Sequence, residues 1–166
     1  MSGNGAYLIL KRDDSKKLQS IGTDDEVREF VAGLRQSKLY RSDGLLVECG
    51  NCWDPIHRCL TEGRLDRDAG EFPLNHFVLG GKHMFRGTGF MAVLVRPDIV
   101  PLVAEMARDF KRSDFHDRYF ALDQSDFGRA PTEKEFDLVW STFRQIQQLF
   151  DDAAADRAAV LFTVTL

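Results

Sequence analysis

The chain has 166 residues, the length of one domain that can bury its own core without disulfides or a structural metal. Apolar residues make up 43% and charged residues 29% of it, which excludes a disordered, collagen-like or coiled-coil protein. The formal net charge of −4 argues against sequence-independent binding to nucleic acid or to an anionic membrane.

The first part of the chain predicts two strands separated by a capped helix. Residues 6–11 form a short apolar run with aromatic and branched side chains, which is typical of a strand, and residues 45–49 predict another. Between them, Thr23 and Glu26 form a capping box. The helix that begins there should end near Ser37, and it carries one apolar stripe: Val27, Phe30, Val31 and Leu34.

The middle of the chain predicts a helix, an ambiguous segment and a buried strand. The helix should begin at Asp54-Pro55, with Asp54 as its cap, and stop at Gly63. Residues 72–81 are apolar and end in a glycine pair, so a short helix and a strand both stay open. After a loop, the strand over residues 90–95 should be buried on both faces, because its side chains do not alternate.

Helices dominate the rest of the chain. A helix should begin at Pro97-Asp98, with a stripe of Ile99, Leu102, Val103, Met106 and Phe110, and Ser113 is expected to cap a short helix after it. Thr132 and Glu135 form a second capping box before the longest helix, whose stripe is Phe136, Val139, Trp140, Phe143, Ile146 and Phe150. Residues 159–166 then predict a C-terminal strand.

These elements predict a single α+β domain over residues 1–166. Several helices should cover a mixed β-sheet, and a long C-terminal helix should precede the last strand. The longest apolar runs, residues 90–95 and 158–162, are far shorter than the ~20 residues of a membrane span. The start, Met1 to Gly5, is polar and uncharged, so we expect no secretory signal and a cytoplasmic location.

The three cysteines could form a metal site, but ordinary thiols explain them better. Their odd number favours reduced side chains. Cys49 and Cys52 form a Cys-x-x-Cys pair, and with His57 and Cys59 they would supply four zinc ligands. However, His57 and Cys59 are two positions apart on the expected helix and would not share a face. A redox role for the pair lacks the usual βαβ setting. We therefore expect buried thiols and no metal or cofactor.

Histidine and glycine residues in the middle of the chain are the other candidates for chemistry. His57 lies close to Asp54 and Cys59 in the sequence, but a catalytic triad is defined by geometry rather than by spacing. We expect His57 to be a half-buried helix residue that is bonded to a neighbouring carbonyl. Gly80 and Gly81 match only part of a phosphate-binding loop, and we interpret them as a turn that requires a positive φ.

Acidic residues gather in two places. The first group, Asp66, Asp68 and Glu71, does not have the spacing of a calcium loop and is expected in a solvated loop. The second group alternates with aromatic residues between Phe115 and Phe127, which suits a recognition surface, although we expect most of these aromatic side chains in the core. The second group consists of Asp114, Asp117, Asp123 and Asp126.

A series of short motifs also indicates a family. In chain order they are Trp53-Asp54-Pro55-Ile56-His57, Leu60-Thr61-Glu62-Gly63, Pro73-Leu74-Asn75-His76 and Val78-Leu79-Gly80-Gly81. This series resembles the YfbM-like family, domain of unknown function family 1877, and the long last helix with its final strand is similar as well. The resemblance implies an α+β bacterial cytosolic protein and no particular reaction. It also admits an immunity role, because some small proteins of this kind accompany toxins.

Two classes of function follow. We favour a non-catalytic protein-binding domain, in its sharpest form an immunity or inhibitor protein. Its acidic residues Asp114, Asp117, Asp123 and Asp126 would then attract a toxin, and its partner would be another protein rather than nucleic acid or a membrane. The alternative is an enzyme or small-ligand-binding protein with a pocket around Trp53, His57, His76, Gly80 and Gly81. Asp54, next to Trp53, is a further candidate binding residue. The sequence does not indicate an oligomeric state.

Overall fold

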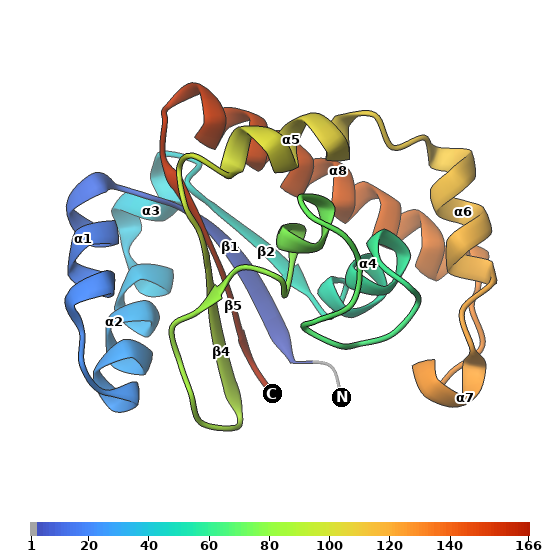
Figure 1. The fold of residues 1–166 in the computed structure, drawn as a ribbon, viewed down its shortest axis with the longest axis horizontal. Helices are drawn as coiled ribbons and strands as arrows, with labels where there is room; N and C mark the ends of the chain where they lie inside the picture. The colour runs from blue at the N-terminus through green and yellow to red at the C-terminus, as the bar shows by residue number, and fades with distance from the viewer. Residues whose placement is uncertain (1–2) are drawn as a thin grey trace.

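A five-stranded antiparallel sheet forms the middle layer of the molecule (Figure 1). The computed structural model describes residues 3–166; Met1 and Ser2, the first residues of the polar start, lie outside the described residues. The strands are arranged in the order β2-β1-β5-β4-β3. Their bounds are β1 Asn4–Leu10, β2 Leu46–Gly50, β3 Lys82–His83, β4 Phe90–Val95 and β5 Ala159–Thr165.

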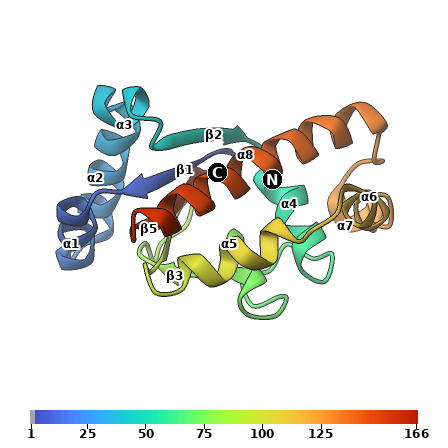
Figure 2. The same cartoon turned by 90° about the horizontal axis from the view of Figure 1, so that it is seen from above.

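Helices cover both faces of this sheet (Figures 1 and 2). One face carries α1 Arg12–Ser20, α2 Asp24–Gln36 and α3 Lys38–Ser42. The other face carries α4 Trp53–Leu60, the short 3-10 helix η1 Leu74–Phe77, α5 Val100–Arg108 and α8 Glu133–Ala155, with α6 Arg112–Phe120 and α7 Gln124–Phe127 at its far end. Within residues 3–166, no helix is long and apolar enough to cross a membrane.

Two hydrophobic cores lie on the two faces, because successive side chains of a strand point to opposite sides. On β1, Tyr7 points toward α8 and Leu8 points toward α2. Across the central pairing, Tyr7 faces Phe162 and Leu8 faces Leu161 on β5. The prediction that residues 90–95 form a strand buried on both faces is confirmed.

The α+β class, the long C-terminal helix and the final strand are confirmed, but the sheet is antiparallel throughout instead of mixed. When a single helix connects two neighbouring strands, it carries the chain from the end of the first strand back to the other end of the sheet. The second strand then runs in the same direction as the first, so the two strands are parallel. Here α1 and α2 lie between β1 and β2, whereas α5 and α8, which pack side by side, lie between β4 and β5. Each pair of helices returns the chain to the end it left.

The two predicted threonine N-caps are confirmed at the N-termini of long helices. The Thr23 side chain accepts a hydrogen bond from the backbone N–H of Glu26 at the start of α2, and Thr132 does the same for Glu135 at α8. Ser37 is the C-cap of α2, as expected. In the ambiguous segment, residues 74–77 form a 3-10 helix and the following strand extends over only two residues.

Four local predictions are wrong. The helix α1 was not expected, because Leu18 is its one buried residue and it therefore shows no stripe. Asp54 lies inside α4 and binds Arg58, so it does not cap the helix. Ser113 lies within α6, whose cap residue is Lys111. The predicted stripe of α5 is wrong at Leu102 and Met106, which are exposed, and right at Val103; the helix also buries Val100, Ala104 and Ala107.

Candidate functional site

The helix α4, which carries three of the predicted site residues, is buried along its whole length. Trp53 packs its ring against Phe162, with ring centroids 5.7 Å apart, and donates its indole N–H to the carbonyl of Gly3 at 2.9 Å. The carboxylate of Asp54 is 2.6 Å from Nε of Arg58. Trp53 therefore joins α4 to the sheet, whereas the contact of Asp54 with Arg58 lies within α4.

His57 connects α4 to the loop that follows it. Its Nε2 lies 2.7 Å from the carbonyl oxygen of Asp66, so the ring donates its proton to that carbonyl. The hydroxyl of Thr61 donates to the carbonyl of His57 at 2.8 Å. Burial lowers the pKa of His57, which keeps the ring neutral at physiological pH. The expected hydrogen bond to a neighbouring carbonyl is present, although the ring is buried rather than half-buried.

His76, Gly80 and Gly81 form a tight turn before β3. His76 is half-buried, its Nδ1 lies 2.7 Å from Oδ1 of Asn75, and burial lowers its pKa. The two glycines do not have positive φ angles, contrary to expectation. They are needed for close approach instead. A Cβ at Gly80 would lie 2.6 Å from the carbonyl oxygen of Asn75, and one at Gly81 would lie 2.7 Å from that of Leu94.

The cysteines are buried free thiols. Burial raises the pKa of both Cys49 and Cys59 to about 12, and it also raises the pKa of Cys52. A thiol with so high a pKa is a poor metal ligand and a poor nucleophile. In the part of the chain that the structure describes, no three Cys, His, Asp or Glu side chains are arranged to hold a metal ion, so the zinc alternative has no geometry to support it.

Acidic side chains do converge at one place, a groove at the far end of α4. We call it the acidic groove and define it by residues 62–66, which follow α4, and residues 121–126, which follow α6. The cavity has a volume of about 490 Å³. Four carboxylates line it: Glu62, Asp66, Asp123 and Asp126. Arg64, which forms an ion pair with Glu62, is the one cation among the lining residues.

The acidic groove contains two of the four aspartates singled out in the sequence. Asp123 and Asp126 line it, whereas Asp114 and Asp117 are exposed on α6 and do not. Glu62 and Asp66 were not singled out together with them. No local pattern could have paired them, since the two segments come together only in the folded protein, where α4 packs against α6.

A network of ion pairs holds the far wall of the acidic groove. Arg58, which is 5% exposed, binds Asp54 and also donates through Nη1 to the carboxylate of Asp126. The guanidinium groups of Arg58 and Arg129 lie 5.6 and 4.0 Å from the ring centroid of Phe127. Arg129 in turn binds Glu135 at the start of α8. The segment between α6 and α8 is thereby fixed to the body of the protein.

Glu135 completes this network. Burial alone would raise the pKa of its carboxyl, but hydrogen bonds from Arg129 and Tyr119 outweigh burial and lower the pKa. Tyr119 lies on α6, so the carboxylate joins α6, α8 and the segment between them. The expectation that most aromatic side chains between Phe115 and Phe127 lie in the core is confirmed, since Phe115, Tyr119 and Phe127 are buried and Phe120 is exposed, at 38%.

The surface cavities of the described chain include five of about 300–490 Å³. None of these five is lined by Trp53, His57, His76, Gly80 or Gly81. The small-ligand pocket around these residues stays a prediction.

Comparison with known proteins identifies a family and a fold. The family described as "Domain of unknown function (DUF1877)" matches residues 1–163. The crystal structure of YfbM from Escherichia coli, a protein of unknown function, is similar over 98% of this chain and 99% of that chain, with a TM-score of 0.70 and 14% identity. No curated protein matches the sequence. The chain belongs to the DUF1877 family and has the fold of YfbM.

Proposed function

We propose that this domain is a non-catalytic binding protein whose acidic groove receives a basic segment of a partner protein. In its sharpest form the domain is an immunity or inhibitor protein, and the partner is a toxin. The observation that carries the proposal is the meeting of Glu62, Asp66, Asp123 and Asp126 in one groove. A concave surface of one sign concentrates its field and attracts an oppositely charged partner.

The backbone adds to the negative potential of the acidic groove. Residues 62–66 directly follow the C-terminus of α4, and residues 121–126 directly follow that of α6. The C-terminal end of a helix carries a partial negative charge, which acts in the same direction as the carboxylates. A Lys or Arg side chain in the groove would therefore meet both ionised side chains and helix ends.

The carboxylates on the α7 side are held in place before any partner arrives. The side chain of Asp123 accepts hydrogen bonds from the hydroxyl and the backbone N–H of Ser125, at 2.7 and 2.9 Å, and these lower its pKa. Asp126 is held by Arg58. Groups that are already ordered lose less conformational entropy on binding. Phe120, exposed at the end of α6 directly before the groove residues, supplies the kind of aromatic contact that dominates binding energy.

A charge reversal at Glu62 tests the proposal. Glu62 is exposed and lies in the acidic groove, whereas Glu29 is exposed on α2, on the opposite face of the sheet. Glu62→Lys and Glu29→Lys therefore make the same change of charge inside and outside the groove. A short synthetic peptide of alternating Arg and Gly is titrated into each variant at physiological ionic strength, and amide chemical shifts are followed by NMR.

We expect the shifts to concentrate in residues 62–66 and 121–126. We expect Glu62→Lys to weaken binding about tenfold, which corresponds to ~1.4 kcal/mol, and Glu29→Lys to have no effect. Shifts spread over every acidic surface, or equal weakening by both variants, would overturn the proposal. Affinity purification from the native host, with the same two variants, then tests the partner: a basic protein in stoichiometric amount should be retained by the wild type and by Glu29→Lys and lost from Glu62→Lys.

A further inference from the structure

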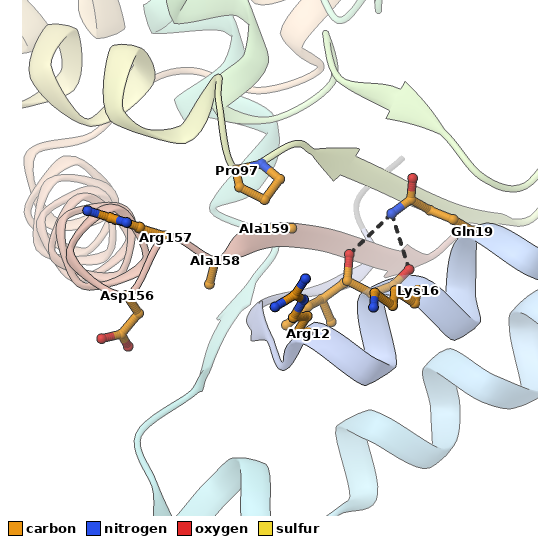
Figure 3. Close-up of a pocket in the computed structure, with 10 residues that line it drawn as sticks. Arg12, Lys16, Gln19, Pro97, Asp156, Arg157, Ala158 and Ala159 are labelled. Atoms are coloured by element: carbon orange, nitrogen blue, oxygen red, sulfur yellow. Dashed lines mark hydrogen bonds between the residues drawn. The ribbon is translucent and has the colours of Figure 1, made fainter.

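A second cavity lies at the end of the sheet where β1 finishes and β5 begins (Figure 3). It has a volume of about 380 Å³. One wall is α1, the other is the turn between α8 and β5, and Pro97 after β4 closes one side. We call it the basic pocket. Its charged lining residues are Arg12 and Lys16 on α1 and Asp156 and Arg157 on the turn, so three cations stand against one carboxylate in a protein that is acidic overall.

Arg12 and Lys16 are one helical turn apart, and they therefore project from the same face of α1. Figure 3 shows them on the α1 wall, whereas Asp156 and Arg157 extend from the opposite wall and away from α1. Within residues 3–166, none of these three cations takes part in an ion pair. Most other arginines of the protein are paired. The α1 wall thus presents two positive charges that no carboxylate neutralises.

The other lining groups are uncharged. Leu10 and Ala159, which are each 2% exposed, and the neighbouring Pro97 and Ala158 form an apolar floor. Arg12 and Lys16 themselves are exposed to solvent. Ser15 lies between the two cations, and its Oγ accepts a hydrogen bond from the Gln19 amide at 3.3 Å, so its own O–H is available to donate.

Arg157 occupies a strained position in the turn. Its φ angle is 53°, and it is the one residue other than glycine with a positive φ in the described chain. The N–H of Ala158 bonds to the carbonyl of Ala153 at 2.9 Å, which is the pattern of a helix end that normally has glycine at this position. The strain lies in the backbone of this wall, since the Arg157 side chain itself extends away from α1.

We infer that the basic pocket binds a phosphate group. Arg12 and Lys16 supply the two positive charges, and the hydroxyl of Ser15, next to Lys16 on the same helix, donates a hydrogen bond to the bound group. A phosphate carries close to two negative charges and has several acceptor oxygens, which matches this set of donors. The volume accommodates free phosphate as well as the phosphate end of a small phosphorylated metabolite.

Inorganic phosphate and ribose 5-phosphate are the probes, each titrated at constant ionic strength maintained with chloride. Amide shifts in residues 12–19 and 156–159 are followed by NMR. The double variant Arg12→Gln/Lys16→Gln removes the two central charges. The matched control, Arg67→Gln/Lys134→Gln, removes one arginine and one lysine that are exposed elsewhere and unpaired within the described chain.

We expect saturable binding that the double variant weakens at least tenfold and that the control leaves unchanged. Comparable affinity for the two probes would assign the site to free phosphate, and at least tenfold tighter binding of ribose 5-phosphate would assign it to a phosphorylated metabolite. Shifts that do not saturate, or that persist in the double variant, would overturn the inference. For Arg157→Gly, which relaxes the backbone, we expect a higher Tm with unchanged phosphate binding, because the Arg157 side chain extends away from α1; markedly weaker binding would overturn the assignment of the site to the α1 wall.

Discussion

Arg58 and Asp126, 68 positions apart in the sequence, form the ion pair that joins α4 to the wall of the acidic groove. The guanidinium is 5% exposed, whereas the carboxylate of Asp126 is 54% exposed. The second partner of Arg58, Asp54, is as buried as the arginine itself. One buried cation therefore serves two functions: it neutralises a carboxylate in the core, and it positions a carboxylate at the surface.

The first prediction separates these two functions. Arg58→Ala leaves Asp54 buried without its partner, and the loss of one member of a buried pair costs roughly 3–5 kcal/mol. Asp126→Asn removes the charge of the more exposed partner but leaves the ion pair of Arg58 with Asp54 intact. We expect this variant to lose less than ~1 kcal/mol of unfolding free energy. Urea unfolding measures both free energies. Equal losses for the two variants would contradict the arrangement.

Local signals in the sequence were sufficient for most elements but not for the way they meet. Thr23 and Thr132 identified two helix starts, because a capping box depends only on residues three positions apart. The strand direction and the acidic groove depend on contacts across the fold, such as that of Arg58 with Asp126. α1 was missed because a helix that buries only Leu18 has no periodic stripe. Gly80 was assigned to a turn correctly, but the reason for it, contact with Asn75, exists only in three dimensions.

Buried His57 should make stability depend on pH. Its pKa in the folded protein lies below the value of about 6.5 that it has in an unfolded chain. Above about pH 6.5 both states are neutral and the contribution is constant. As the pH falls below about 6.5, the unfolded state binds a proton that the folded state does not, so stability is lost at up to ~1.4 kcal/mol per pH unit.

The measurement is the free energy of unfolding at a neutral and at a mildly acidic pH. His57→Gln, which does not titrate, should show a smaller loss than the wild type. Some loss should remain in the variant, because the pKa of His76 is also lowered by burial. The same loss in His57→Gln and in the wild type would rule out this role of His57.

Two glycine-to-alanine changes should have opposite effects. At Gly80 the new Cβ would lie 2.6 Å from the carbonyl oxygen of Asn75, a backbone atom that cannot move aside. We expect Gly80→Ala to destabilise the protein by about 1–3 kcal/mol. Gly33 lies within α2 with no atom within 4 Å of a new Cβ, so Gly33→Ala should stabilise it by about 0.5–1 kcal/mol. Thermal unfolding should show a lower Tm than the wild type for Gly80→Ala and a higher Tm for Gly33→Ala. A change in Tm of the same sign in both variants would contradict this prediction.

The three thiols should be unreactive until the protein unfolds. Burial raises the pKa of Cys49 and Cys59 to about 12, several units above the value of about 8.5 for a free thiol. The fraction of reactive thiolate falls by a factor on the order of 10³. Ellman's reagent at mildly alkaline pH should therefore label the native protein very slowly, and label all three cysteines rapidly in urea. Rapid labelling of the native protein would show that at least one thiol is accessible and activated.

The last prediction concerns Thr163, in the middle of the central strand. Thr163 is fully buried, and its hydroxyl has no hydrogen-bond partner within the described residues. Its neighbours across the two strand pairings are Ala6 and Ala92, which offer no polar side chain. Valine has nearly the same shape without the unsatisfied hydroxyl, so Thr163→Val should stabilise the protein by about 1 kcal/mol.

Thr142→Val is the contrast, because the buried Thr142 is hydrogen-bonded to Cys52. The loss of this hydrogen bond should destabilise the protein by about 1 kcal/mol. Chemical unfolding measures both changes, and destabilisation by Thr163→Val would mean that the hydroxyl is satisfied in solution by a buried water molecule.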